Sequence, residues 1–231
     1  KLNYPWWRRF SPVEMNKPRI CAVIKDKKAD VAGIGPLADL FELRIDLVDD
    51  GWEDIAGRLT KPWIATNRLA EEGGHWGESE ARHKEELLKA LGLGAAIIDI
   101  ELGTRNLDKF VPLIKKRAEC LISYHDMDAT PPLERLKKIV TRQLAAGADI
   151  AKVVTTAGSF EDNFTVLKLI GEFPRDRIIA FCMGPEGRLS RVLCPLLGGQ
   201  FTYAAITEGD QSASGQLTVS QLASLYNMVG K

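Results

Sequence analysis

The clearest structural signal in the sequence is Asp149-Ile150-Ala151-Lys152-Val153-Val154-Thr155, an apolar and β-branched run with a single lysine at its centre. A run of this length and composition is typical of a buried β-strand. Segments with helical spacing of apolar residues lie on both sides of it, at residues 132–146 and 160–172. Strands that alternate with helices indicate parallel pairing, because parallel neighbours need a long crossover connection.

The same alternation continues in both directions along the chain. From Pro18 onward, short apolar runs are followed by polar breaks and then by segments with helical periodicity. Strands are expected at residues 19–25, 40–46, 63–68, 96–101, 119–125, 149–154, 177–182 and 201–206. Helices are expected at residues 30–39, 52–59, 79–91, 106–117, 132–146, 160–172, 187–196 and 218–229.

Eight strand–helix units in a chain of this length predict an α/β fold of the closed (β/α)8 type, a TIM barrel, as a single domain. An open, doubly wound sheet is the competing architecture, but it usually carries fewer strands. No linker or shift in composition divides residues 18–231, which we assign to the barrel. Residues 1–17 have no clear period and include the pair Trp6-Trp7, and we expect them to form an N-terminal extension packed on the barrel.

Composition narrows the classes of partner and cofactor. The 31 basic and 31 acidic residues cancel, which argues against a nucleic-acid or membrane-surface partner. No apolar run is long enough to span a bilayer and no secretory leader is recognisable, so we expect a cytoplasmic protein with its four cysteines as buried thiols. Metal-ligand spacings and glycine-rich phosphate loops are missing, and we expect no cofactor. The oligomeric state stays open, with a homodimer as one option.

Side-chain parity within the expected strands places charge inside the barrel. In residues 40–46, Glu42, Arg44 and Asp46 alternate with apolar residues that must face the helices. Three further strands send polar residues inward in the same way: Thr66, Arg68, Asp99, Glu101, Ser123 and His125. Burying so many charges only to hold a fold would be costly, because pairing repays the lost solvation only in part. Function is therefore the more economical explanation.

Arg44 and Arg68 can neutralise Glu42, Asp99 and Glu101 as a network, which leaves Lys152 and His125 as the reactive pair. A lysine in a dry environment is a candidate carbonyl nucleophile, because desolvation disfavours its charged form. Histidine suits proton transfer near neutral pH. Taken alone, each residue also fits a structural role, as a carboxylate-paired lysine or a hydrogen-bonded histidine. We expect His83 to be solvated on its helix and His75 to lie on a glycine-rich loop at the rim.

Six motifs follow one another along the chain: Phe41-Glu42-Leu43-Arg44-Ile45-Asp46, Asn67-Arg68-Leu69-Ala70-Glu71-Glu72-Gly73-Gly74, Ser123-Tyr124-His125-Asp126, Ala151-Lys152-Val153, Met183-Gly184 with Gly187-Arg188-Leu189-Ser190-Arg191, and Ser212-Ala213-Ser214-Gly215-Gln216. In this order they resemble type I 3-dehydroquinate dehydratase, over the chain from about Pro18 to its end. The resemblance implies a (β/α)8 barrel that dehydrates 3-dehydroquinate to 3-dehydroshikimate, in the shikimate pathway, with a small-molecule substrate.

The resemblance also implies roles for nine residues. Lys152 would form an imine (Schiff base), His125 would act as general acid and base, and Glu72 would orient that histidine. The substrate-contacting positions would be Glu42, Arg44, Arg68, Arg191, Ser212 and Gln216. Arg191, which alone would be interpreted as a surface arginine, would receive the substrate carboxylate. The chain departs from the family at Ser214, where proline is usual, and a serine there relaxes the backbone of the closing loop.

Two other functions stay open on the residues alone. A class I aldolase is another imine-forming barrel lyase and would share the lysine of the sixth strand, but carbon–carbon cleavage does not call for the His125 arrangement. A non-catalytic barrel that binds a metabolite or partner through Trp6-Trp7-Arg8-Arg9-Phe10 would make Lys152 dispensable. The presence of the lysine, the histidine and the arginines together favours the dehydratase.

Overall fold

The computed structural model describes residues 17–48 and 50–230, so nearly all of the predicted N-terminal extension, including Trp6-Trp7, lies outside the described residues. Within these ranges the strands are β1 (Ile20–Ile24), β2 (Leu40–Arg44), β3 (Trp63–Thr66), β4 (Ile97–Glu101), β5 (Glu119–His125), β6 (Ile150–Thr156), β7 (Ile178–Met183) and β8 (Thr202–Ala205). They form one parallel sheet in the order β7-β6-β5-β4-β3-β2-β1-β8.

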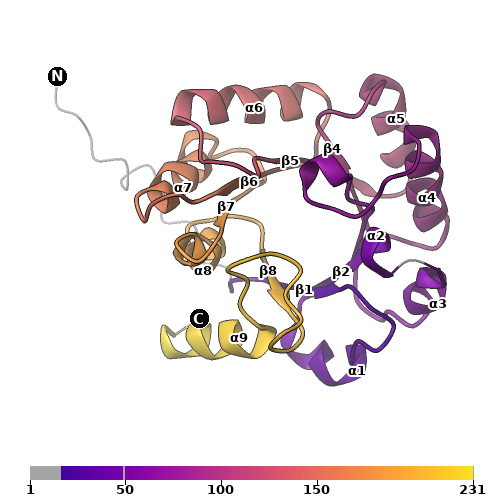
Figure 1. Ribbon diagram of the computed structural model, residues 1–231, viewed down its shortest axis with the longest axis horizontal. Helices are drawn as coiled ribbons and strands as arrows, with labels where there is room; N and C mark the ends of the chain where they lie inside the picture. The colour runs from indigo at the N-terminus through magenta and orange to yellow at the C-terminus, as the bar shows by residue number, and fades with distance from the viewer. Residues whose placement is uncertain (1–16, 49, 231) are drawn as a thin grey trace.

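Helices follow the strands and form an outer ring around the sheet (Figure 1). The longer ones are α4 (Glu80–Gly92), α5 (Leu107–Ile114), α6 (Leu133–Ala145), α7 (Asp162–Glu172), α8 (Arg188–Leu196) and α9 (Val219–Met228). Shorter ones are α1 (Val31–Ile34), η2 (Gly35–Leu37), α2 (Ile45–Val48), α3 (Trp52–Ala56) and η3 (Ala70–Glu72). This arrangement confirms the predicted (β/α)8 barrel.

The barrel is nearly closed. Backbone ladders join each strand to its neighbours from β7 round to β8, and a hydrogen bond of 2.9 Å from the Gln200 amide to the Ile178 carbonyl links the start of β8 to β7. The register sets Ser123 opposite Lys152 and Cys21 opposite Tyr203. Side chains of the same parity in adjacent strands therefore meet in common layers inside the barrel.

Two hydrophobic clusters hold this frame together. Phe41 and Leu43 on the outward face of β2 are buried in one cluster with Trp52 and Ile55 of α3. Residues of the opposite parity, Glu42 and Arg44, are also buried but line a cavity instead. The parity predicted for this strand is confirmed, and the apolar cluster outside the sheet supplies the burial that keeps the charged side in place.

The structure departs from the predicted elements mainly at their ends. The expected helix at 30–39 is split into α1 and η2, since Pro36 has no amide hydrogen for a helical bond. The second strand ends at Arg44 rather than Asp46, and the chain turns at once into α2. All four cysteines are free and buried, as predicted. None of the helices in the described ranges is long and apolar enough to cross a membrane.

The prediction that His83 is solvated is wrong. His83 is fully buried on the inner face of α4, where it shares one helical stripe with Leu87 and Ala90. Its Nε2 lies 2.6 Å from the Asn67 carbonyl oxygen and 3.4 Å from the Glu101 carboxylate. His75, in contrast, is exposed on the loop after β3, as expected for a rim residue.

Candidate active site

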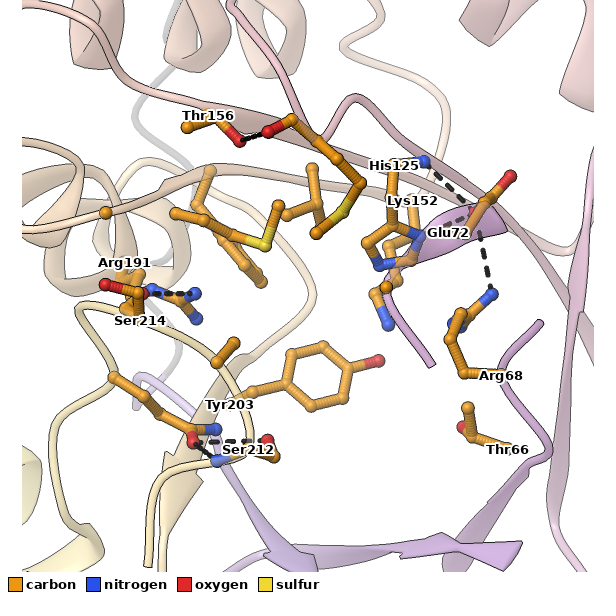
Figure 2. Close-up of a pocket in the computed structure, with 18 of the residues that line it drawn as sticks. Thr66, Arg68, Glu72, His125, Lys152, Thr156, Arg191, Tyr203, Ser212 and Ser214 are labelled. Carbon is orange, nitrogen blue, oxygen red and sulfur yellow. Dashed lines mark hydrogen bonds and ion pairs between the residues drawn. The ribbon is translucent and has the colours of Figure 1, made fainter. Parts of the chain in front are cut away.

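A cavity of about 350 Å³ lies at the carboxyl ends of the strands, where barrel enzymes carry their active sites (Figure 2). Its walls come from β2, β3, β5, β6, β7 and β8 and from the loops that follow β3, β7 and β8. All nine residues selected from the sequence line it: Glu42, Arg44, Arg68, Glu72, His125, Lys152, Arg191, Ser212 and Gln216.

Lys152 lies in the middle of β6 and is only 4% exposed. Its Nζ donates a hydrogen bond of 3.0 Å to Asp99 Oδ2 and lies 3.9 Å from Glu42 Oε1. The same nitrogen stands 4.3 Å from the centroid of the Tyr203 ring, within the range of a cation–π contact. The lysine is therefore paired with a carboxylate, but the pair faces a cavity in which a carbonyl compound could reach the nitrogen.

His125, at the end of β5, is held by Glu72 from the loop after β3. Glu72 Oε2 lies 2.7 Å from His125 Nδ1 and also accepts the His125 backbone amide at 3.1 Å. Because that oxygen already acts as an acceptor, we assign the ring proton to Nδ1, which leaves Nε2 without one. Desolvation, together with the charges of Arg68 and Lys152, holds the pKa of His125 well below its usual range. The imidazole is thus neutral near pH 7 and can accept a proton.

Glu72 is also perturbed. Burial raises the pKa of its carboxyl to about 8, and the nearby carboxylates of Glu101 and Asp99 add to the rise against the opposing charge of Arg68. A carboxyl and an imidazole that are both driven toward their neutral forms and lie within hydrogen-bond distance titrate as a unit. With the Nδ1–Oε2 hydrogen bond made, Nε2 is the ring nitrogen that remains to exchange a proton with a ligand.

Arg68 is the centre of the buried charge network. Its guanidinium lies 2.7 Å from Asp99 and 2.8 Å from Glu101, and it donates to Ser123 Oγ at 2.7 Å. Its distance to Glu72 Oε2 is 3.7 Å. Burial alone would raise the pKa of Asp99, but Arg68 and Lys152 outweigh it and hold that pKa well below the usual range. Asp99 therefore stays ionised beside the Lys152 ammonium.

Arg44 has a different partner from the one expected. It bonds Asp46 with two hydrogen bonds of 2.9 and 2.7 Å, whereas Glu42 accepts a hydrogen bond of 2.8 Å from Thr66 Oγ1. The cause is the early end of β2, because the first turn of α2 brings Asp46 back toward the arginine of its own strand end. Asp46 also accepts the His75 amide at 3.0 Å, which ties the rim loop to this pair.

Arg191, on α8, is only 2% exposed, so its interpretation as a surface arginine is wrong. Its guanidinium stacks 4.6 Å from the centroid of the Phe181 ring and donates a hydrogen bond of 3.3 Å to the Ser214 carbonyl. Among the residues described, it forms no ion pair with a carboxylate, and desolvation lowers its pKa to about 10. A buried cation without a fixed counter-charge is suited to bind an anion from solution.

The loop after β8 covers one side of the cavity. Gln216 Oε1 accepts hydrogen bonds from the Ser212 amide at 2.9 Å and from its hydroxyl at 3.2 Å. The Ser214 carbonyl accepts the Gly184 amide at 3.2 Å. Gly215 has φ +79°, and a Cβ there would lie 2.2 Å from the Gly184 carbonyl oxygen, so only glycine fits. The loop therefore packs directly on the turn that follows β7.

The cavity also contains residues that were not selected from the sequence. The most significant is Tyr203, which lies in β8 with its ring on the Lys152 nitrogen. Its parity, shared with Phe201 and Ala205, could have indicated an inward side chain. Apolar walls come from Val154, Phe181 and Met183. Over the part of the chain that the structure describes, no cluster of three or more histidine, cysteine or acidic side chains is arranged to hold a metal ion.

Comparison with known proteins places this geometry in a family. A model of the type I 3-dehydroquinase family matches residues 20–231. The 3-dehydroquinate dehydratase of Dehalococcoides mccartyi (strain ATCC BAA-2100 / JCM 16839 / KCTC 5957 / BAV1) is 42% identical over 216 residues, which cover 93% of this chain and 97% of that protein. The crystal structure of type I 3-dehydroquinate dehydratase from Clostridium difficile, with covalently modified comenic acid, superposes with a TM-score of 0.80 at 25% identity and covers 92% of both chains.

More distant barrels share the fold alone. Deoxyribose phosphate aldolase from Aeropyrum pernix superposes with a TM-score of 0.57 at 15% identity, over 100% of this chain and 99% of that one. The family model, in contrast, matches nearly the whole chain, and the Dehalococcoides protein is 42% identical to it. The chain therefore belongs to the type I 3-dehydroquinase family.

Proposed function

We propose that this chain is a hydro-lyase that dehydrates 3-dehydroquinate to 3-dehydroshikimate through an imine on Lys152, with His125 as general base and acid. Membership of the family supports the overall reaction. The observation that carries the mechanism is the meeting of three groups in one cavity: a buried amine, a neutral imidazole and an arginine without a carboxylate partner.

The substrate is a six-membered ring with a carboxylate and a hydroxyl on one carbon and a ketone two carbons away. Arg191 can receive the carboxylate in two parallel hydrogen bonds, because the guanidinium fork matches the geometry of a carboxylate. Lys152 lies across the cavity from Arg191 (Figure 2), so the ketone of a substrate bound in this way can reach its nitrogen. Ser212 and Gln216 close the loop side and supply polar groups to the substrate hydroxyls. Glu42, Arg44 and Arg68 supply the same kind of contacts on the opposite side.

Imine formation comes first. The Lys152 amine adds to the ketone carbon, and loss of one water gives a protonated imine, which draws electrons better than the ketone did. The ammonium must release a proton to solvent before it attacks, and Asp99 Oδ2, which accepts a hydrogen bond of 3.0 Å from Nζ, keeps the nitrogen oriented. The cation of the protonated imine occupies the site where the ammonium was, so Asp99, Glu42 and the Tyr203 ring continue to balance its charge.

Proton transfer follows. His125 Nε2 removes a proton from the carbon between the imine carbon and the hydroxyl-bearing carbon, which gives a neutral enamine. The imidazolium then delivers that proton to the hydroxyl as it leaves as water, and a conjugated imine forms. Hydrolysis consumes one water and releases the product and the free amine, so one water is lost overall. Glu72 keeps the imidazole oriented through both transfers, because Nδ1 stays bonded to Oε2.

A class I aldolase, the competing lyase, would use the same nucleophile. Carbon–carbon cleavage does not call for the His125–Glu72 arrangement, and the likeness to the Aeropyrum pernix aldolase extends to the fold alone. The His125–Glu72 pair and the buried arginine both favour elimination from a carboxylated ring. We therefore retain the dehydration as the proposed reaction.

The experiment that tests the proposal is reductive trapping. Incubation of the protein with 3-dehydroquinate and sodium borohydride should add, on Lys152 alone, the mass of substrate or product less one oxygen atom, because condensation loses water and reduction adds two hydrogens. The variant Lys137→Met, which removes a partly exposed lysine paired with Glu134 and Glu172 outside the cavity, serves as the matched control and should be labelled fully. Lys152→Met should not be labelled. An unlabelled wild-type protein, or labelling that survives Lys152→Met, would exclude the imine.

A further inference from the structure

Tyr203 carries a buried polar atom that the fold does not use. The residue is 4% exposed, and its phenol oxygen has no hydrogen-bond partner among the described residues. Buried hydroxyls without a partner are uncommon, because desolvation of the group is not repaid. A phenylalanine at this position would satisfy the packing equally well, so the hydroxyl calls for an explanation outside the fold.

The ring of Tyr203 is fixed by its neighbours. It packs edge-on against Phe201 and Phe181, with centroid distances of 5.4 and 6.0 Å, and the Lys152 nitrogen lies 4.3 Å above its face. With the ring fixed in this way, the direction of the C–O bond is also fixed. Figure 2 shows the oxygen directed toward the side of the cavity where Thr66 and Arg68 lie, away from Arg191.

The hydroxyl keeps its proton. Desolvation, followed by the negative charges of Glu42 and Asp99, raises the pKa of Tyr203 well above its usual range. The group is therefore a neutral phenol near pH 7, and it can donate one hydrogen bond as well as accept one. A substrate oxygen that reaches it would find a donor that is already desolvated and oriented.

The proposed function decides which substrate oxygen that is. With the carboxylate on Arg191 and the ketone carbon on Lys152, the ring carbon opposite the carboxylate-bearing carbon points away from Arg191. In 3-dehydroquinate this carbon is next to the ketone and carries a hydroxyl. That hydroxyl therefore lies on the side of Thr66 and Arg68, toward which the phenol oxygen is directed.

We propose that Tyr203 is a substrate-binding residue whose phenol donates a hydrogen bond to the substrate hydroxyl next to the ketone, while its ring supports the Lys152 nitrogen. The inference rests on the proposed function, because the position of that hydroxyl follows from the carboxylate on Arg191 and the imine on Lys152. It adds a specificity contact to the site: rings with that hydroxyl are bound better than rings without it.

The test compares Tyr203→Phe with a matched loss of phenol elsewhere. Tyr203→Phe keeps the ring over the lysine and removes only the hydroxyl, and it should lower kcat/KM for 3-dehydroquinate about fivefold, as expected for one neutral hydrogen bond. The control is Tyr226→Phe, since Tyr226 is also buried and donates to the Val192 carbonyl, outside the cavity. Its kcat/KM should stay within about twofold of the wild type.

A second ligand separates a lost contact from a disturbed site. The analogue in which that hydroxyl is replaced by hydrogen keeps the reacting groups and should be an alternative substrate, with KM values for the wild type and Tyr203→Phe within about twofold of each other, because it cannot accept the bond. The urea midpoint of Tyr203→Phe should equal or exceed that of the wild type, since no bond within the fold is lost.

Two results would overturn the inference: an unchanged kcat/KM for Tyr203→Phe, or an equal loss of affinity for the substrate and for the deoxy analogue. Borohydride labelling of the wild type identifies which claim has failed. A labelled Lys152 with a fully active Tyr203→Phe removes the phenol contact and leaves the proposed function intact. An unlabelled wild type removes the imine and, with it, the placement of the substrate.

Discussion

Replacing Arg191 by methionine should separate binding from stability. Arg191 is 2% exposed, and its guanidinium stacks on Phe181 and bonds the Ser214 carbonyl, but it has no carboxylate partner in the part of the chain described. The folded protein thus carries the desolvation of a cation that only a ligand relieves. Methionine fills a similar volume without charge, so Arg191→Met removes the anion site and leaves the packing largely in place.

The size of the effect follows from the contacts. Loss of two charge-assisted hydrogen bonds to the substrate carboxylate is worth about 3 to 4 kcal/mol, or roughly a hundredfold to a thousandfold in kcat/KM. In the unliganded protein, removal of the uncompensated charge contributes about 1 to 2 kcal/mol of stability. Loss of the cation–π contact and of the bond to Ser214 offsets about the same amount. The free energy of unfolding should therefore stay within about 1 kcal/mol of the wild type.

Both quantities are measurable on the same samples. Steady-state assays that follow ultraviolet absorbance of the conjugated product give kcat and KM, and urea denaturation gives the free energy of unfolding. Arg82→Met is the matched control, because Arg82 is exposed on α4 and pairs with the exposed Glu78 and Glu85, and none of the three lines the cavity. A fall of less than about tenfold in kcat/KM for Arg191→Met would place the substrate carboxylate elsewhere. A loss of more than about 2 kcal/mol in stability would show that the arginine is structural.

Three further predictions test the other parts of the site. His125→Ala should still form the borohydride adduct, while kcat falls about a hundredfold to ten-thousandfold; near-normal turnover would reassign the proton transfer. The pKa of Glu72 in the folded protein is raised to about 8, so the folded protein binds this proton more tightly than the unfolded chain does. Urea titrations should therefore show that the free energy of unfolding of the wild type falls by about 2 to 4 kcal/mol relative to Glu72→Gln as the pH rises from 5 to 8. Parallel pH curves for the two proteins would contradict this. Lys25 pairs with Asp210 at 3.0 Å and ties the covering loop to the end of β1, so Lys25→Ala should raise KM about twofold to threefold with kcat unchanged, and an unchanged KM would show that the loop is held without this pair.

The order of strands and helices could be predicted because short apolar runs alternate along the sequence with segments in which apolar residues have helical spacing. The interior of β2 alternates charged and apolar residues, and the apolar set matches the helices that cover it. The ends of elements were harder, since they depend on competition with tertiary contacts. Asp46 shows this: its parity suits a strand, but the chain turns into α2 directly after Arg44, and that turn makes Asp46 the partner of Arg44 through two hydrogen bonds.

The burial of His83 follows from its position on the helix, although its polarity favours solvent. Counting four residues along α4 from His83 reaches Leu87, and the next turn brings Leu91, so the histidine lies on the apolar stripe. The polarity of the His83 side chain favours exposure to solvent, whereas its position on the apolar stripe of the helix indicates burial in the core. A histidine can be buried on an apolar stripe when a buried polar group forms a hydrogen bond with its ring. The Asn67 carbonyl is that group for His83.

The charged residues of the site could be predicted from the motifs, but which cation pairs with which carboxylate could not. Sequence parity places Arg68 and Lys152 among inward carboxylates without saying which pairs form. In the structure Asp99 serves both cations, at 2.7 and 3.0 Å, and Arg44 is neutralised by Asp46. Every inward cation near the lysine is thus matched by a fixed carboxylate. A substrate carboxylate would meet those negative charges on that side and a bare guanidinium on the other, so electrostatics alone would orient it toward Arg191 and present its ketone to the lysine.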